Sequence, residues 1–207
     1  MQIIIKYFPG LTSEQISHFK KIGSLYQDWN VKTKILPRNE IDSIYERHIL
    51  YSLAIAKIIR FVPGTKILDV GTGGGFPGIP LAIFFPTSYF VLIDPIAKRI
   101  KMVQAIAHEL KLRNVIAVRS KVEVFKEKFD FVASRAVTSF PTFVGLVKKN
   151  ISADSKNVLP NGIMYLKGGS IAEELTGFMD TAKIFEIPDF FSEPFFESKK
   201  VIYLPVD

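Results

Sequence analysis

Four glycines follow one aspartate closely in the segment "ILDVGTGGGFPGIPLAI", residues 67–83. The pattern indicates a buried strand that carries Asp69 near its end, followed by a sharp turn and a helix. Glycines at 71, 73 and 75 allow a tight turn, and they leave no Cβ where a ligand would approach the backbone. A loop that serves only helix–strand packing needs one glycine rather than four. We therefore expect a ligand-binding turn here.

The acid at the strand end favours one cofactor class over another. Gly73, Gly75 and Gly78 fit the G-x-G-x-x-G spacing of dinucleotide-binding proteins, although Pro77 stands where the phosphate-binding helix would begin. Asp69 would repel a pyrophosphate, but it can accept hydrogen bonds from an ammonium group or an adenosine hydroxyl. This favours S-adenosylmethionine, which carries a cationic sulfonium and an amino-acid moiety, over NAD.

A second acid ends the next predicted strand. The segment "FVLID" ends at Asp94, 19 residues after Gly75. A carboxylate at this position can accept hydrogen bonds from both ribose hydroxyls of a nucleoside. Alternatively, Asp94 caps a helix that begins at Pro95, and one side chain can fill both roles. Asp94 alone does not separate the two cofactors.

A parallel sheet would bring these acids to one edge, and the remaining sequence predicts such a sheet. Strands alternate with helices, which is typical of a doubly wound α/β fold. Strands are predicted at 66–70, 89–94, 114–120, 129–136 and 161–169, and a closing antiparallel pair at 181–187 and 199–206. Helices are predicted at 77–85, 98–112, 140–150 and 171–178. Two further helical regions, 12–28 and 39–61, precede the junction at Pro63-Gly64.

The composition narrows the possible chemistry. The 207 residues include no cysteine, which excludes disulfides, thiolate metal sites and a cysteine nucleophile. His18, His48 and His108 have no metal-binding spacing, so we expect no metal, and we expect His48 to be a packed helix residue. The net charge of +7 suits a polyanionic partner such as nucleic acid. No segment has the pattern of a signal peptide or a membrane span, so we expect a cytoplasmic protein.

The segment "DVGTGGGFPGIPLAI" resembles the signature of the bacterial 16S rRNA guanine-N7 methyltransferase family, known as RsmG or GidB. Further similar motifs are "WN" at 29–30, "RHILYSL" at 47–53, "LIDPIAKRIKMVQAIAHELKLRNV" at 92–115, "KVEVF" at 121–125 and "SRAV" at 134–137. The resemblance extends from about residue 12 to the C-terminus. The sequence differs from the usual family motifs at Lys34, Tyr51 and Lys121.

The resemblance implies a Rossmann-like class I methyltransferase with a mostly parallel seven-stranded sheet. A helical extension at 1–62 would precede the methyltransferase domain at 63–207. The implied reaction transfers a methyl group from S-adenosylmethionine to N7 of guanine 527 in the 530 loop of 16S rRNA and leaves S-adenosylhomocysteine. The implied partner is the small ribosomal subunit, and we expect a monomer.

The resemblance also assigns a cofactor site around the two acids. With the residues already named, the site would comprise Asp69, Gly71, Gly73, Gly75, Phe76, Asp94, Pro95, Ile96, Val122, Glu123 and Arg135. In this assignment Glu123 accepts from the adenine amino group, while Val122 and Ile96 enclose the ring. Arg135 would meet an anion, either the methionine carboxylate or an RNA phosphate.

The proposed reaction needs no catalytic base. Guanine N7 carries a lone pair and no proton, so attack on the methyl group requires positioning and desolvation. Methylation of pyrimidine C5 normally needs a cysteine, which this chain lacks. Methylation of exocyclic amines typically uses an Asn/Asp-Pro-Pro-aromatic motif, and the corresponding segment here is "ASRAVTSF".

Basic residues are expected to contact the RNA backbone around the site. They are Lys34, Arg47, Lys98, Arg99, Lys101 and Lys121. Three alternatives stay open. An NAD-dependent oxidoreductase would need a proton donor such as a Tyr-x-x-x-Lys pair, which we do not find. A non-catalytic RNA-binding assembly factor would not need an open cofactor pocket. A small-molecule methyltransferase would not need the excess of basic residues.

Overall fold

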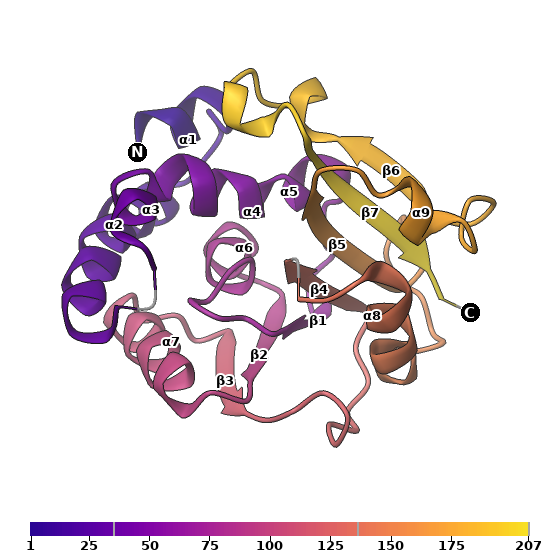
Figure 1. Cartoon of the computed structure of the whole chain (residues 1–207). Coiled ribbons are helices and arrows are strands. Elements are labelled where there is room, and N and C mark those ends of the chain that lie inside the picture. The colour runs from indigo at the N-terminus through magenta and orange to yellow at the C-terminus, as the bar shows by residue number, and fades with distance from the viewer. Residues whose placement is uncertain (35, 136, 207) are drawn as a thin grey trace.

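Seven strands form one sheet within residues 1–34, 36–135 and 137–206, which a computed structural model of the chain describes. Their order is β3-β2-β1-β4-β5-β7-β6 (Figure 1). The strands are β1 Lys66–Val70, β2 Tyr89–Asp94, β3 Val115–Arg119, β4 Phe131–Arg135, β5 Gly162–Gly168, β6 Lys183–Glu186 and β7 Lys199–Pro205. Pairs from β3 to β5 are parallel, whereas β7 is antiparallel to β5 and β6. The predicted sheet and its closing pair are confirmed.

The fourth strand begins later than predicted. Phe129 makes a single bridge with Ile151 instead of joining the ladder, so β4 starts at Phe131. The last residue of the predicted strand, Ala136, lies outside the described residues.

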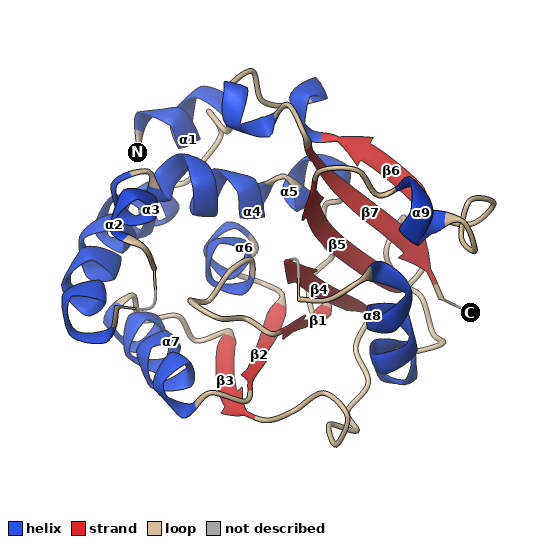
Figure 2. Ribbon diagram, viewed as in Figure 1, coloured by secondary structure: helices blue, strands red, loops and turns tan. Residues whose placement is uncertain are grey.

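Helices cover both faces of the sheet (Figure 2). Helices α6 Gly78–Phe84 and α7 Ala97–Glu109 pack on one face, and α8 Phe140–Val147 and α9 Ala172–Leu175 pack on the other. Successive strand residues alternate between the two cores, with Ile67 in the first and Leu68 in the second. The apolar residues that recur at helical spacing along α7 and at its C-cap are all buried: Ile100, Val103, Ile106, Ala107 and Leu110.

The N-terminal segment is helical and packs on the face that carries α6 and α7. It comprises α1 Gln2–Tyr7, α2 Ser13–Thr33, α3 Arg38–Asp42, a π-helical turn Tyr45–Leu50, α4 Tyr51–Leu53 and α5 Ile55–Ile58. Thr12 caps α2 in a capping box with Gln15. The helix continues to Thr33, further than expected, and the helical region predicted at 39–61 consists of several short segments.

One core joins the N-terminal helices to the sheet. Phe19 and Tyr26 of α2 belong to the same buried cluster as Ile67 and Phe90. Both segments contribute side chains to this core, and the division into a helical extension at 1–62 and a methyltransferase domain at 63–207 stays a prediction.

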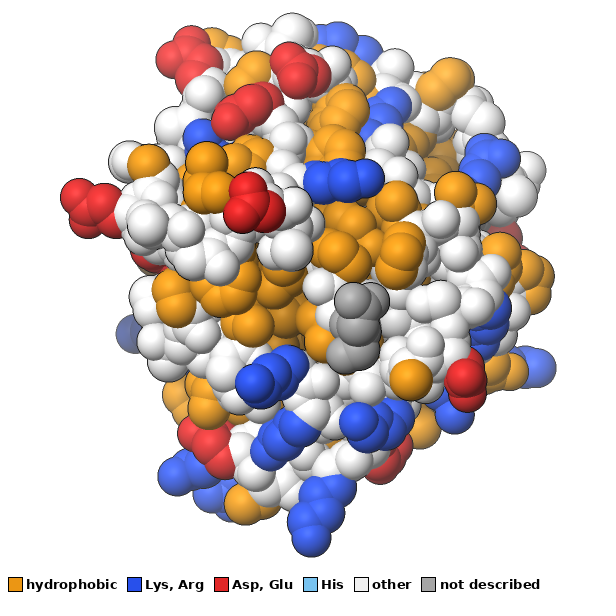
Figure 3. Space-filling view, turned by 90° about the vertical axis from the view of Figure 1, so that its right-hand side faces the viewer, with side chains coloured by type: hydrophobic (Ala, Val, Ile, Leu, Met, Phe, Trp, Pro, Cys, Tyr) orange, Lys and Arg blue, Asp and Glu red, His pale blue; other side chains and the backbone are white. Residues whose placement is uncertain are grey.

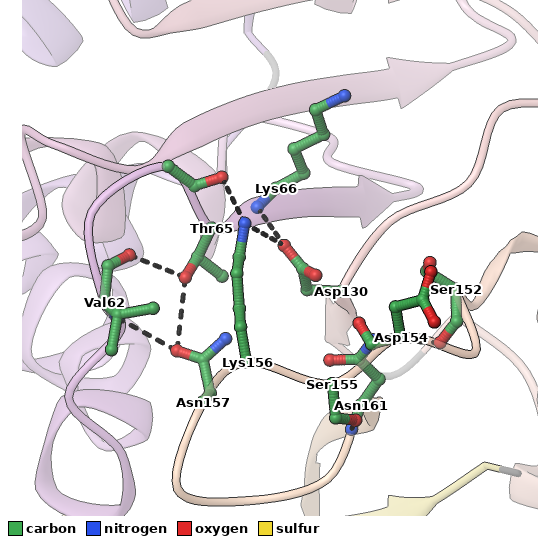
Figure 4. A network of polar contacts seen from close by, with 11 residues as sticks. Val62, Thr65, Lys66, Asp130, Ser152, Asp154, Ser155, Lys156, Asn157 and Asn161 are labelled. Carbon is green, nitrogen blue, oxygen red and sulfur yellow. Dashed lines mark hydrogen bonds and ion pairs between the residues drawn. The ribbon is translucent and has the colours of Figure 1, made fainter.

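Polar contacts stabilise the junction at Pro63-Gly64, at the end of the sheet opposite the glycine turn (Figure 4). Val62 donates its backbone N–H to Asn157 Oδ1 at 2.9 Å. Lys156 Nζ donates to the carbonyl of Gly64 at 2.8 Å and lies 3.3 Å from Asp130 Oδ2. The loop after α8 therefore holds the chain where it leaves the helical segment and enters β1.

Strand β6 forms one edge of the sheet, and Figure 3 shows the molecule from the side on which this edge lies. Exposed apolar side chains near this edge include Met179 and Ile184, and Lys183 and Glu186 lie at the two ends of β6. Charged residues on an edge strand discourage pairing with another chain. Among the described residues, no helix has the length and apolarity to cross a membrane.

Candidate active site

The glycine turn adopts the backbone conformation that the sequence predicted. Gly71, Gly73 and Gly75 have φ values of 67°, 56° and 95°, a region that side chains rarely adopt. Added Cβ atoms would meet different surroundings. At Gly75 the Cβ would lie 2.8 Å from a side-chain atom of Ile79, whereas at Gly73 it would meet nothing closer than 3.8 Å. Gly75 is therefore required for packing, and Gly73 presents an open face.

Asp69 supports the turn from inside the protein. It is fully buried at the end of β1, and its Oδ2 accepts from Thr72 Oγ1 at 2.5 Å and from the Gly78 N–H at 2.9 Å. Its Oδ1 is buried and has no hydrogen-bond partner within the described residues. Burial raises the pKa of Asp69 to about 7, although the hydrogen bonds from Thr72 and Gly78 and the charge of Arg135 oppose the shift. The predicted contact between Asp69 and a cofactor stays a prediction.

Gly78 owes its identity to Asp69 rather than to a dinucleotide. An added Cβ would lie 2.7 Å from Asp69 Oδ2 and 2.7 Å from Leu92 Cγ. The G-x-G-x-x-G spacing noted in the sequence thus has a packing explanation at its third glycine.

Asp94 at the end of β2 is also buried, with 1% of its surface exposed. Its Oδ1 accepts from the Ile96 N–H at 2.9 Å, and its Oδ2 accepts from the Gly73 N–H at 3.1 Å and from Arg99 Nη1 at 3.2 Å. The predicted capping role is wrong, because α7 begins at Ala97 with Ile96 at its N-cap and has no side-chain cap; the bond from the Ile96 N–H instead orders the loop between β2 and α7. The ribose contact stays a prediction. A carboxylate has about four lone-pair sites, so it retains capacity for a further donor.

The loops expected around an adenine lie beside Asp94. Ser120 donates its N–H to the Asp94 carbonyl at 3.2 Å, which joins the loop after β3 to the loop after β2. Ile96 is 45% exposed, and Pro95 and Glu123 are also exposed, whereas Val122 is buried. Of the two side chains expected to enclose the ring, Ile96 is therefore open to a ligand and Val122 is covered.

Arg135 lies at the end of β4, on the other side of the turn from Asp94. Its Nη2 donates to His48 Nδ1 at 2.9 Å, and its Nη1 lies 3.4 Å from the carbonyl oxygen of Arg47. The guanidinium carbon lies 5.3 Å from the ring centroid of Phe76 and 5.9 Å from that of Tyr51. Burial lowers the pKa of Arg135, but an arginine stays protonated. Within the described part of the chain no carboxylate forms an ion pair with it.

His48 is a packed helix residue, as expected, and it also links two charged groups. Its Nε2 lies 3.0 Å from Glu40 Oε2, and its ring packs 4.8 Å from that of Phe76. Burial, with the charges of Arg135 and Arg47, lowers the pKa of His48 to about 3, so the ring is neutral. Because Nδ1 accepts from Arg135, the single proton is on Nε2 and is donated to Glu40.

A cavity of about 270 Å³ opens beside Arg135. Its lining residues come from the N-terminal helices and from the strand ends, and they are Glu40, Arg47, His48, Tyr51, Arg135, Gly168, Phe195 and Lys199. No local motif connects Glu40, Gly168, Phe195 or Lys199 to the glycine turn, so the sequence did not indicate them. The signals for this cavity were two family-like segments, "RHILYSL" and "SRAV", which contain the other lining residues.

The predicted RNA-binding residues divide into separate groups. Lys98 and Lys101 are exposed on α7, and Lys121 is exposed after β3. Arg99 contacts Asp94, and Arg47 lines the cavity, where its Nε is buried without a described partner. Lys34 is exposed at the C-terminal end of α2.

Comparisons with known proteins agree with this geometry. The family model described as rRNA small subunit methyltransferase G (GidB) matches residues 15–192. The chain is 52% identical over 206 residues to the ribosomal RNA small subunit methyltransferase G of Flavobacterium johnsoniae, covering 100% of this chain and 98% of the relative. The enzyme of the same name from Bacteroides thetaiotaomicron is 47% identical over 203 residues, covering 98% of each chain.

Solved structures show the same fold at low sequence identity. A SAM-dependent methyltransferase from Aquifex aeolicus has a TM-score of 0.58 at 15% identity, covering 83% of this chain and 100% of that one. Precorrin-6y C5,15-methyltransferase from Geobacter metallireducens has a TM-score of 0.55 at 11% identity, covering 76% and 88%. The fold is therefore that of class I methyltransferases. The family model and the full-length relatives show that the chain belongs to the GidB family of rRNA small subunit methyltransferases G.

Proposed function

We propose that the protein transfers a methyl group from S-adenosylmethionine to N7 of a guanine in 16S rRNA of the small ribosomal subunit, at guanine 527 of the 530 loop. The observation that carries the proposal is the glycine turn, which is open at Gly73 and lies between a pair of buried acids and a cationic cavity. The names of the full-length relatives support the substrate class, and the similarly folded enzymes support the cofactor.

The residues around the turn fit S-adenosylmethionine. The open face of Gly73 accommodates a ligand against the backbone, and the unpaired buried Oδ1 of Asp69 favours a nearby positive charge. Asp94 retains acceptor capacity for ribose hydroxyls, and exposed Ile96 offers an apolar surface for a ring. Two buried carboxylates suit a cationic ligand better than a pyrophosphate.

We assign the binding contacts as follows. The amino-acid part would lie against the turn, and the adenosine part would lie against the loops after β2 and β3. The residues that would hold the cofactor are Asp69, Gly71, Gly73, Gly75, Phe76, Asp94, Pro95, Ile96, Val122 and Glu123. Arg135 would meet the methionine carboxylate or an RNA phosphate, because it carries a charge that no described carboxylate neutralises in an ion pair.

Bound S-adenosylmethionine supplies an electrophilic methyl group, and the residues of the chain supply orientation. Guanine N7 has no proton to lose, so the site needs no base. His48 is unsuited to be one, since its Nδ1 accepts from Arg135 and its Nε2 donates to Glu40. The ring of Phe76 packs against His48 and Arg135. These contacts hold Phe76 in place between the glycine turn and the cavity.

The exposed lysines near the strand ends would contact RNA phosphates. Lys98, Lys101 and Lys121 lie beside the proposed adenosine site, and Arg47 lies in the cavity. Contacts of this kind position a folded RNA without reading its sequence.

Methyl transfer tests the proposed function directly. The purified protein is incubated with S-adenosylmethionine labelled in the methyl group and with small ribosomal subunits or 16S rRNA from cells that lack this gene. We expect label in the 16S rRNA and calorimetric binding of both adenosyl compounds but not of NAD. NAD binding without a response to either adenosyl compound would support the oxidoreductase instead. RNA binding without transfer or cofactor binding would support the assembly factor.

A further inference from the structure

The cavity beside Arg135 lies where an acceptor would meet the cofactor. Gly168 is the last residue of β5, and Lys199, its partner in the ladder, is the first residue of antiparallel β7. Both therefore lie at the same edge of the sheet as the glycine turn. The sheet order places Asp94 on one side of β1, and Arg135 and Gly168 on the other. A cofactor that lies across β1 and β2 would present its far end to this cavity.

The size and charge of the cavity suit one unpaired nucleotide. Its volume of about 270 Å³ is close to the lower limit of roughly 300 Å³ for small-molecule pockets. A stacked base pair does not enter such a space, so the acceptor base has to leave its stack. Arg47 and Lys199 are cations that suit a phosphate, and Glu40 is the acidic residue in the described lining.

The hydrogen bonds of His48 restrict how a guanine can be read. An arginine fork on guanine uses O6 and N7, and this pairing would cover the atom that receives the methyl group. Nη2 of Arg135 is already engaged by His48 Nδ1 at 2.9 Å. The free edge of guanine carries the N1–H and the 2-amino group, which are donors and need an acceptor.

Glu40 supplies that acceptor. Its Oε2 receives the Nε2 proton of His48 at 3.0 Å, and its side chain is 38% exposed at the cavity. The hydrogen bond orients the carboxylate and leaves its other lone pairs available. Adenine presents an amino donor and an unprotonated N1 at the same edge, so a carboxylate would leave one acceptor facing another.

We propose that the cavity between α3 and the ends of β4 and β5 is the acceptor-nucleotide site, and that Glu40 selects guanine by accepting hydrogen bonds from N1–H and the 2-amino group. His48 acts as a positioning residue that orients Glu40 and keeps Arg135 from covering N7. This inference rests on the proposed function and adds the base contact to it.

The test compares Glu40→Gln with Glu46→Gln, a matched control on the π-helical turn outside the cavity lining. Glutamine keeps the size of Glu40 but turns an amide donor toward the guanine donors. Methyl transfer is measured on small subunits that carry either guanine or inosine, which lacks the 2-amino group, at the target position. For the guanine substrate we expect kcat/KM of Glu40→Gln to fall about tenfold or more, with partial recovery in Glu40→Asp. The Glu46→Gln control should retain the wild-type value.

The inosine substrate separates base reading from general damage. Wild-type protein should lose about tenfold on inosine, whereas Glu40→Gln should show a much smaller difference between the two bases. Binding of S-adenosylhomocysteine and the melting temperature should match the control. Equal transfer by the two Gln variants, or an unchanged preference for guanine in Glu40→Gln, would overturn the role of Glu40. Failure of the wild-type protein to methylate any rRNA would instead overturn the proposed function.

Discussion

Arg99 lies against Asp94, with its Nη1 3.2 Å from the carboxylate that we assign to the ribose. The two partners differ in solvent exposure: the Asp94 side chain is 1% exposed and the Arg99 side chain is 41% exposed. The arginine can therefore move into solvent while the acid stays in place. Asp94 keeps the N–H groups of Gly73 and Ile96 as donors when the arginine is absent, so loss of the contact does not leave its carboxylate without hydrogen bonds.

This relationship predicts unequal effects of the two partners on cofactor binding. Asp94→Asn should weaken binding of S-adenosylhomocysteine by roughly 1–3 kcal/mol, the scale of hydrogen bonds to a charged group. Arg99→Gln should change it by less than about twofold. Calorimetry on both variants measures this. Asn is preferable to Ala, because its one amide oxygen can still accept from Gly73 or from Ile96, whereas Ala would leave both N–H groups without an acceptor. An Asp94→Asn variant with normal affinity would restrict Asp94 to its contacts with the backbone of Gly73 and Ile96.

The contrast between Gly73 and Gly75 predicts separate losses of binding and stability. Gly73→Ala places a Cβ in open space at a positive φ, so it should cost about 1 kcal/mol of stability and strongly weaken cofactor binding. Gly75→Ala adds a collision with Ile79 and should destabilise the fold more. Urea unfolding and calorimetry on both variants distinguish the effects. Equal cofactor affinity of Gly73→Ala and the wild type would show that the ligand does not lie against this turn.

The raised pKa of Asp69 predicts a pH dependence of stability. Asp69 ionises near its ordinary value of 3.8 in the unfolded chain and near 7 in the folded one. The folded state therefore holds a proton that the unfolded state has released, and the contribution to stability is complete below pH 4 and declines up to pH 7. The decline is on the order of 1 kcal/mol per pH unit at most.

Asp69→Asn removes the titrating group while keeping an oxygen for Thr72 and Gly78. Its free energy of unfolding, relative to that of the wild type, should improve as the pH rises from 4 to 7. Urea titrations at several pH values measure the difference. A difference that is constant over this range would mean that Asp69 ionises normally in the folded protein.

The exposed lysines at the strand ends predict salt-sensitive RNA binding. Lys98→Glu combined with Lys101→Glu should weaken binding to 16S rRNA and reduce the dependence of log affinity on log salt, because fewer counterions are released. Arg99 is left unchanged, since it contacts Asp94. The matched control reverses Lys66 and Lys128, which are exposed at the opposite end of the sheet, at the start of β1 and before β4.

Cofactor binding should be the same in both double variants. Filter binding across a range of salt concentrations compares them. If the control pair weakens RNA binding as much as the test pair does, the RNA does not dock at the cofactor edge of the sheet.

The sequence predicted the sheet and the turn well, because both depend on local patterns. The helix predicted at 98–112 is α7, and its apolar residues at helical spacing are buried, because a period near 3.6 places them on one face. The conformations of Gly71, Gly73 and Gly75 follow from their lack of a Cβ. In contrast, the π-helical turn at Tyr45–Leu50 has a different period, and α1 is too short to show one.

The cavity could not be predicted in the same way. The hydrogen bond between Arg135 and His48 joins residues that are 87 positions apart. Lys199 reaches the same place from the last strand, because β7 runs antiparallel to β5. Such contacts depend on how distant elements pack, and no short motif records them. Asp69 was placed correctly at the strand end, but its bonds to Thr72 and Gly78 became visible only in three dimensions.

The position and chemistry of the transferred methyl group test the central claim most directly. Small subunits from cells that lack the gene are treated with the purified protein and S-adenosylmethionine, and the 16S rRNA is digested and mapped by mass spectrometry. The account predicts one new 7-methylguanosine, at guanine 527, and none after treatment with the Gly73→Ala variant. A methyl group on another atom or another RNA, or no methyl group with a protein that binds the cofactor, would contradict it.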